Sequence, residues 1–232
     1  MADSVVIVTG GGRGIGRAIA QRFAAAGACV VAAARSADEL HETKSLIERA
    51  GGRCDTHVTD VCVADEIGAL INATTQRHGR IDVLVNNAGV APDATIEQLD
   101  ASIFETINSV NIDAVYHACR AVWPVMKRQG GGVIVNVSSV ASIDAFPGLA
   151  AYGASKAWVN AWTKALAEEG RPVNIRVFAV APGAVETRML RDLLPDYPKG
   201  ETLDPADVAG MVFTLAQPEC RYATGQTVFI KR

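Results

Sequence analysis

The sequence predicts one α/β domain in which helices cover both faces of a parallel sheet. Three observations carry this prediction. The chain has 232 residues, of which 49% are hydrophobic, and this is enough for one well-buried core. Short apolar runs alternate with segments of helical period, a pattern typical of βαβ units. No linker or repeat interrupts the alternation, so we expect a single doubly wound domain over residues 1–232.

Seven short runs are expected to form the strands of the sheet. Most are rich in Val, Ile or Ala, and polar or turn-forming residues bound them. The predicted strands are residues 4–9, 28–34, 53–59, 81–86, 132–138, 174–181 and 226–230. Because the segments between them have helical period, the sheet is expected to be parallel, seven-stranded and flanked by helices on both faces.

The connection at residues 187–205 is irregular. It contains Pro195, Pro198, Gly200 and charges of both signs. This composition predicts a flexible flap or short helices, which we place over the carboxyl edge of the sheet, on the substrate side.

Composition and charge exclude several classes of partner. The formal net charge is −3 and there is no basic run, whereas nucleic-acid binding needs clustered Lys and Arg. The first residues lack the basic and apolar regions of a signal peptide. The longest stretch of low polarity, residues 23–34, is shorter than the roughly 20 residues of a membrane helix. We therefore expect a cytoplasmic protein that binds neither nucleic acid nor membrane.

The cysteines and histidines give no sign of a disulfide framework or a metal site. The five cysteines are odd in number and show no C-x-x-C spacing, so reduced thiols are expected. The four histidines form no metal-ligand pattern either, and we interpret them as surface or structural residues. The residues concerned are Cys29, Cys54, Cys62, Cys119, Cys220, His41, His57, His78 and His117.

A glycine-rich loop follows the first predicted strand. Its spacing is T-G-x-x-x-G-x-G, with glycines at Gly10, Gly14 and Gly16, and an Ala- and Ile-rich helix follows. Glycines let the backbone approach a pyrophosphate, and a helix amino terminus supplies free N–H groups and a positive dipole end. A merely tight turn is the alternative. The strand before and the helix after favour a Rossmann-type dinucleotide site, which also includes Gly12, Arg13 and Ile15.

A possible proton donor lies in residues 131–156. The predicted strand there ends at two hydroxyls, Ser138 and Ser139, and the next helix carries Tyr152 and Lys156. Residues four apart share a helix face, and a cation close to a phenol lowers the phenol pKa from its ordinary value near 10. The same pair also occurs on many solvated helix faces, so it indicates catalysis only together with the other motifs.

In chain order these motifs resemble the short-chain dehydrogenase/reductase family. The resemblance rests on the glycine loop, Asn86-Asn87-Ala88-Gly89, Asn111, Ser139, Tyr152 and Lys156, and it extends from Val5 to about Phe229. The resemblance implies an oxidoreductase that interconverts a ketone or aldehyde and an alcohol. The sequence also resembles 3-oxoacyl carrier-protein reductases and carbonyl reductases, but this similarity is general to the family and does not identify the substrate.

The resemblance also implies the role of each catalytic residue. Tyr152 donates the proton during reduction, Ser139 holds the substrate oxygen, and Lys156 biases the phenol and grips the nicotinamide ribose. Asn111 completes a proton relay, although a lone helical Asn is ordinarily a surface residue. We choose Ser139 over Ser138 because thirteen positions separate it from Tyr152, which is the family spacing.

The end of the second strand indicates NADP(H) as the cofactor. An acidic residue usually holds the ribose 2′-hydroxyl of NAD, whereas a 2′-phosphate needs a cation. The resemblance places Ala34 where NAD-dependent members carry Asp, and Arg35 then matches the cation of NADP-dependent members. Arg13 is a plausible second cation, and Ser36 follows. An ordinary exposed arginine is the alternative interpretation of Arg35.

Further cofactor contacts follow from the resemblance. Asp60 and Val61 match a pair that contacts adenine, although a plain helix cap would also explain the aspartate. The segment after the sixth strand matches P-G-x-x-x-T near the nicotinamide. In two places the sequence departs from the family: Phe178 replaces a usual Asn, and the end of the chain lacks V-D-G-G. The implied contacts are Asn87, Ala88, Gly89, Pro182, Gly183, Val185 and Thr187.

Assembly and two rival functions stay open. In the family, helices at residues 103–128 and 152–169 pair across a two-fold axis, which predicts a homodimer or homotetramer. An apolar stripe that includes Trp158 and Trp162 supports this, although both could pack inward. The rivals are a catalytically silent dinucleotide-binding regulator and a short-chain epimerase or dehydratase.

Overall fold

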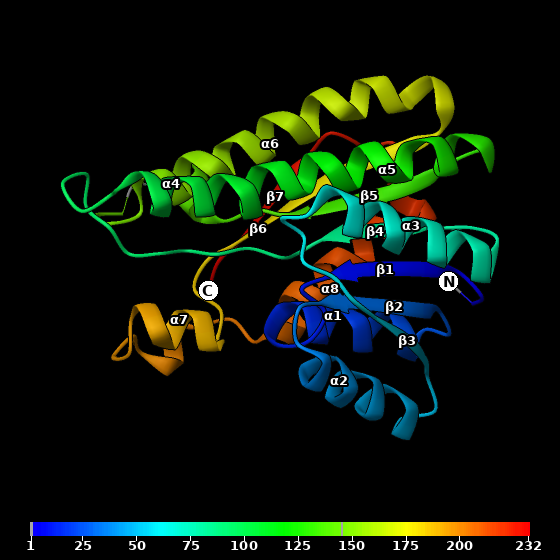
Figure 1. The fold of residues 1–232 in the computed structure, drawn as a ribbon, viewed down its shortest axis with the longest axis horizontal. Coiled ribbons are helices and arrows are strands. Elements are labelled where there is room, and N and C mark those ends of the chain that lie inside the picture. The colour runs from blue at the N-terminus through cyan, green and yellow to red at the C-terminus, as the bar shows by residue number, and fades with distance from the viewer. Residues whose placement is uncertain (1, 145) are drawn as a thin grey trace.

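Seven parallel strands form one sheet, in the order β3-β2-β1-β4-β5-β6-β7, in the computed structural model, which describes residues 2–144 and 146–232 (Figure 1). Each observed strand lies within two residues of the predicted bounds. They are β1 (Val5–Thr9), β2 (Cys29–Ala34), β3 (Arg53–Val58), β4 (Val83–Asn86), β5 (Gly132–Val137), β6 (Ile175–Pro182) and β7 (Thr227–Ile230). The strand order reverses on either side of β1, and ligands bind doubly wound sheets at such a switch point.

Helices cover both faces of the sheet, which confirms the predicted fold class (Figure 1). Apolar side chains of α1, α2 and α8 pack in one core cluster, and those of α3, α5 and α6 pack in the other. The helices are α1 (Gly14–Ala25), α2 (Ala37–Arg49), α3 (Ala64–His78), α4 (Ala101–Asn108), α5 (Ala114–Arg128), α6 (Ala150–Gly170), α7 (Arg188–Leu193) and α8 (Pro205–Ala216).

The strands at the centre of the sheet are apolar on both faces, as a sheet covered by helices requires. All five residues of β1 are buried, and in β6 only Arg176 keeps partial exposure. Phe178 of β6, which stands where the family resemblance predicts an Asn, is fully buried in the cluster formed with α1 and α8. Hydrophobic packing therefore fills this position.

The irregular segment at residues 187–205 forms short helices, one of the two structures that its composition predicted. It contains α7 and a 3₁₀ turn over Lys199–Glu201. Arg191 stabilises it by an ion pair with Glu186 and by donating to the carbonyls of Pro195 and Tyr197, at 3.2 and 2.6 Å. A single parallel bridge between Val185 and Leu203 closes the segment against the end of β6. None of the helices in the described ranges combines the length and apolarity needed to cross a membrane.

Candidate active site

The glycine loop joins β1 to α1 at the switch point of the sheet. Gly10 and Gly14 have φ angles of +64° and +51°, a region that L side chains rarely adopt. A Cβ at Gly16 would collide with the carbonyl of Gly10, so the loop can close only with glycine there. No side chain caps the amino terminus of α1, and its first N–H groups are therefore left for a ligand.

Two side chains that were not predicted as site residues hold the glycine loop in place by hydrogen bonds. The carbonyl of Gly12 accepts hydrogen bonds from Arg17 Nη2 at 2.5 Å and from Thr43 Oγ1 at 3.0 Å. Thr43 is fully buried on α2, and Glu42 holds the guanidinium of Arg17 at 2.7 Å. Arg17 lies on α1 and Thr43 on α2, so their positions in the sequence do not predict that both bind the same carbonyl.

The Asn87-Ala88-Gly89 segment braces β4 against β1. Asn87 Nδ2 donates to the carbonyl of Thr9 at 3.0 Å, and the Thr9 hydroxyl accepts from the backbone of Asn87 at 3.0 Å and of Ala88 at 3.2 Å. A Cβ added to Gly89 would lie 3.4 Å from Lys156 Nζ. The segment therefore forms one wall of the site, and Gly89 keeps it close to the lysine.

Asn111 is fully buried and lies in a π-helical turn, Ser109–Asp113, between α4 and α5. Its side chain exchanges two hydrogen bonds of 3.0 Å with the backbone of Val90 and donates to Ser155 Oγ at 3.0 Å. Ser155 in turn donates to the carbonyl of Tyr152 at 2.7 Å. Single π turns often mark functional sites, and this one ties the Asn111 side chain to the helix that carries Tyr152 and Lys156.

Ser139, Tyr152 and Lys156 lie close together at the carboxyl edge of the sheet. Ser139 follows β5 and caps a 3₁₀ turn through Ala141 N at 3.2 Å. Lys156 is buried on α6, where Nζ donates to the carbonyl of Val137 at 2.9 Å and lies 5.9 Å from the centroid of the Tyr152 ring. Ser138 donates to the backbone of Lys156 at 3.1 Å, which leaves Ser139 as the serine beside the phenol.

The pKa values of Tyr152 and Lys156 differ from those expected from their spacing. Burial raises the pKa of Tyr152 above its ordinary value, and the nearby Ser139 hydroxyl offsets only part of this effect. Burial also lowers the pKa of Lys156 to about 8. The prediction that the ammonium lowers the phenol pKa is therefore wrong for the protein alone, because Lys156 contacts a carbonyl and both groups are desolvated.

The end of β2 carries the residues expected to choose the cofactor. Arg35 is exposed directly after the strand, and Ser36 caps α2 by accepting from Glu39 N at 3.3 Å. Arg13 pairs with Glu39 at 3.0 Å, an exposed ion pair of the kind that contributes little to stability. Arg35 and Ser36 therefore lie between β2 and α2, and Arg13 of the glycine loop is linked to α2 through Glu39.

Asp60 and Val61 follow β3. Asp60 Oδ1 accepts from Cys62 N at 3.0 Å, so the carboxylate closes a local turn. The N-cap of α3 is Val63, and the alternative interpretation of Asp60 as a plain helix cap is therefore wrong. Val61 is buried against Ile67 and its neighbours.

The segment after β6 returns to the glycine loop. Gly183 N donates to Ile230 at 2.9 Å, directly after Pro182. Val185 is buried, and Thr187 caps α7 by accepting from Leu190 N at 3.3 Å. A Cβ added to Gly14 would lie 3.4 Å from Thr187 Cγ2, so the fold brings Thr187 onto the glycine loop.

A buried polar network under the site was also missed. Asn86 Nδ2 donates to Asn136 Oδ1 at 2.9 Å, and Asn136 Nδ2 donates to Thr163 Oγ1 at 2.9 Å. The network joins β4 and β5 to α6, the helix that carries Tyr152 and Lys156. A polar Asn within the apolar run Val133-Ile134-Val135-Asn136-Val137 was the available signal, since a buried amide needs partners.

A glycine loop at the switch point, with a phenol, an ammonium and a hydroxyl beside it, defines a class of dinucleotide-dependent oxidoreductases. A sequence profile described as short chain dehydrogenase matches residues 4–198. The chain therefore belongs to the short-chain dehydrogenase/reductase family.

Individual relatives cover almost the whole chain. The 3-oxoacyl-acyl-carrier-protein reductase FabG of Thermotoga maritima is 39% identical over 238 residues, covering 99% of this chain and 97% of that protein. An actinorhodin polyketide ketoreductase solved with NADPH has a TM-score of 0.95 at 32% identity and covers 100% of this chain and 98% of that one. A 3-ketoacyl-acyl-carrier-protein reductase of Brucella melitensis, complexed with NADH, has a TM-score of 0.91 at 32% identity and covers 99% of this chain and 97% of that one.

Proposed function

We propose that the protein is an NADP(H)-dependent oxidoreductase that interconverts a ketone or aldehyde and an alcohol. The observation that carries this proposal is the convergence of Ser139, Tyr152 and Lys156 at the sheet edge that also holds the glycine loop. The reductases among its relatives support the same reaction class.

The dinucleotide fits the residues present. The left-handed turn at Gly10 and the uncapped start of α1 form a cradle for a pyrophosphate. Side chains at Gly10, Gly14 or Gly16 would crowd this cradle. Asn87 lies beside Gly10 and Thr187 beside Gly14 in the same cradle, while Gly89 lies beside Lys156. When bound, the nicotinamide cofactor supplies the hydride. Val185 and Thr187 would hold the carboxamide end, and Asp60 and Val61 the adenine.

The proton chemistry belongs to the protein's own side chains. Tyr152 donates its phenolic proton to the oxygen that becomes the alcohol, and Ser139 holds that oxygen in place. A raised pKa keeps Tyr152 protonated at neutral pH, as a donor for reduction must be. Lys156 holds the ribose, and its Nζ, 5.9 Å from the centroid of the Tyr152 ring, would act on the phenolate only once the bound cofactor draws it from the Val137 carbonyl. Asn111 and the backbone of its π turn continue the proton path toward solvent.

Turnover with a panel of carbonyl compounds tests this proposal. Ketones, aldehydes and 3-oxoacyl thioesters should each be incubated with NADPH while its absorbance is followed. Net consumption of NADPH with formation of an alcohol is the expected result. A regulator would consume none with any substrate, and an epimerase or dehydratase would convert substrate without net consumption, so either outcome would replace the proposed reaction.

NADPH should be preferred over NADH by at least tenfold in kcat/KM, equivalent to about 1.4 kcal/mol. The reason is that Ala34 offers no carboxylate to a 2′-hydroxyl while the exposed Arg35 offers a guanidinium to a 2′-phosphate. Steady-state kinetics with both cofactors measure the ratio. The double substitution Ala34→Asp and Arg35→Ala should move the preference toward NADH, and Arg128→Ala, which removes an exposed arginine at the end of α5, should leave it unchanged. Equal or reversed preference in the unmodified protein contradicts the prediction.

We propose that α4, α5 and α6 form the face through which a homodimer or homotetramer assembles in the cytoplasm. Ala154, Ala161 and Ala165 are exposed along α6, as is Phe104 on α4. Trp158 and Trp162 are half-buried and stack on each other with ring centroids 5.1 Å apart. The stripe therefore combines exposed small residues with a rigid aromatic pair. The segment that contains α7 lies at the other side of the site, where we place the substrate.

Light scattering at micromolar concentration should give a mass of two or four chains of 24.4 kDa. Ala161→Glu should lower that mass, because it places a carboxylate in the middle of the stripe. Ala73→Glu on α3, also at an exposed alanine, serves as the matched control and should not change it. A single species near 24.4 kDa for the unmodified protein would rule the assembly out.

A further inference from the structure

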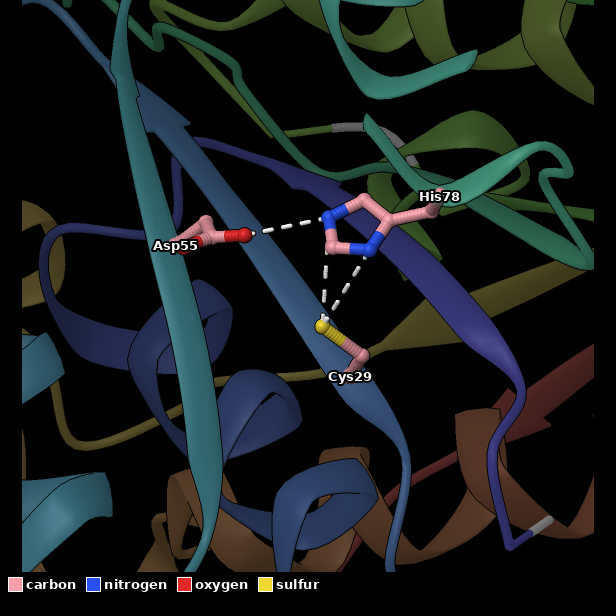
Figure 2. Close-up of side chains that lie close together, drawn as sticks. All are labelled: Cys29, Asp55 and His78. Carbon is pink, nitrogen blue, oxygen red and sulfur yellow. Dashed lines mark hydrogen bonds and ion pairs between the residues drawn. The ribbon is translucent and has the colours of Figure 1, made fainter. Parts of the chain in front are cut away.

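A group of metal-ligating side chains lies at the amino edge of the sheet, opposite the edge that holds Ser139 and Tyr152 (Figure 2). Cys29 is the first residue of β2, Asp55 lies in the neighbouring strand β3, and His78 is the last residue of α3. One donor atom from each lies within 4.8 Å of the others. Three separate elements therefore direct a thiol, a carboxylate and an imidazole toward one point.

The spacing of the donors suits a single small cation. His78 Nε2 lies 3.0 Å from Asp55 Oδ2 and 4.0 Å from Cys29 Sγ. Donor atoms around one tetrahedral zinc lie about 3.4–3.6 Å apart, given bond lengths of about 2.0–2.3 Å. The two separations from His78 Nε2 fall on either side of this range, and the three donor atoms lie within 4.8 Å of one another, so small side-chain movements would bring them onto one ion.

The surroundings hold the carboxylate in a ligating position. Arg77 donates to Asp55 Oδ1 at 2.9 Å, and Oδ2 is thereby directed to His78. His78 and Asp55 are only 16% and 20% exposed. Partners of this kind, which orient a ligand without touching the metal, are typical of metal sites.

The cations around the site are already paired, which argues against an anion site. The cavity beside the cluster has a volume of about 510 Å³, and its lining includes both acids and bases. Each cation has a carboxylate partner: Lys44 with Glu48, Arg53 with Asp3, Arg77 with Asp55 and Arg80 with Asp82.

A nucleophilic triad of Cys29, His78 and Asp55 is also disfavoured. Cys29 Sγ is almost equidistant from His78 Nδ1 and Nε2, at 3.9 and 4.0 Å, so the thiol is not aimed at one nitrogen. Burial and the Asp55 carboxylate raise the pKa of Cys29, whereas a reactive cysteine needs a lowered one. A divalent cation would reverse that balance, because a coordinated thiol loses its proton.

We propose that Cys29, Asp55 and His78 bind one Zn²⁺ ion, with a water molecule from the cavity as the fourth ligand. A mixed sulfur, nitrogen and oxygen set is one that zinc accepts readily. The ion would join β2, β3 and α3 and so stabilise this edge of the fold. The site could not be predicted from the sequence, because Cys29 and His78 are 49 positions apart and Asp55 and His78 are 23 apart.

Zinc titration of untagged protein, first stripped with a chelator, tests the proposal. Calorimetry should give one Zn²⁺ per chain with a Kd below about 1 μM, and zinc should raise the unfolding temperature. Cys29→Ser and His78→Gln should each weaken binding at least tenfold. Co²⁺ used as a probe should show a thiolate-to-metal absorption band that Cys29→Ser abolishes.

Cys62→Ser is the matched control, since it removes an exposed thiol outside the cavity and should leave zinc affinity and the cobalt band unchanged. NADPH binding by each variant reports an intact fold, because the cofactor edge lies at the other end of the strands. If Cys29→Ser does not fold, the zinc affinity of His78→Gln decides whether the proposed site binds the ion. The absence of stoichiometric zinc binding, or a cobalt thiolate band that survives Cys29→Ser, would overturn the proposal.

Discussion

Tyr152→Phe should lower kcat by on the order of 10² to 10⁴ while NADPH still binds. The substitution keeps the ring on α6 but removes the phenolic O–H to which we assign proton donation. The fold should survive, because the phenol makes its contact with Ser139 in the site and not in the core. Steady-state kinetics with an accepted carbonyl substrate and fluorescence titration with NADPH separate the two effects.

The pH profile gives an independent check on Tyr152. Burial raises the pKa of its phenol, so the donor stays protonated through neutral pH. Loss of the Tyr152 proton should therefore lower the reduction rate only above the ordinary phenol value near 10, and a fall nearer pH 8 would report the deprotonation of Lys156. Tyr222→Phe, at a tyrosine that is 84% exposed, should change neither kcat nor the profile. Near-normal turnover by Tyr152→Phe would show that another group is the acid.

The strands and the glycine loop could be predicted because their signals are local. A run such as Val5-Val6-Ile7-Val8 is apolar at every position, and only a strand covered on both faces buries all of it. Gly10, Gly14 and Gly16 occupy positions where a side chain would be strained or would clash, so their spacing in the sequence predicts the shape of the loop.

Features that depend on long-range packing could not be predicted. Thr43 and Arg17 meet at the Gly12 carbonyl only because α2 packs against α1. The Tyr152 and Lys156 pair shows the same limit: its spacing predicts a shared helix face, but the pKa values depend on burial. Burial raises the pKa of the Tyr152 phenol, the opposite of the expected shift, and lowers the pKa of Lys156 to about 8.

Lys156→Met should raise the free energy of unfolding by on the order of 2 kcal/mol near pH 7, although NADPH binding should weaken. Lys156 is only 4% exposed, and its Nζ donates a hydrogen bond to the carbonyl of Val137. A pKa of about 8, lowered from 10.5 by burial, means that the folded protein disfavours the ammonium. Methionine fills a similar volume without the charge, so the variant avoids the desolvation cost and loses only one hydrogen bond.

The pH dependence of this gain has a definite sign. Below about pH 8 the lysine is protonated in both states, and the full cost of the buried charge applies. As pH rises from about 8 to 10.5, the unfolded chain binds a proton that the folded protein has released, so the wild type gains stability. The advantage of Lys156→Met should therefore shrink across this window and vanish above it. Urea unfolding near pH 7 and near pH 10 measures the change.

Lys164→Met supplies the control for a general effect of removing a lysine from α6. Lys164 is exposed on the same helix, so its substitution should stay within about 0.5 kcal/mol of wild type at both pH values. A Lys156→Met protein that is no more stable than wild type near pH 7 would mean that the ammonium is better solvated in the site than its burial implies. Greater stability together with weaker NADPH binding would mean that the enzyme retains a destabilising buried charge because the ribose needs it.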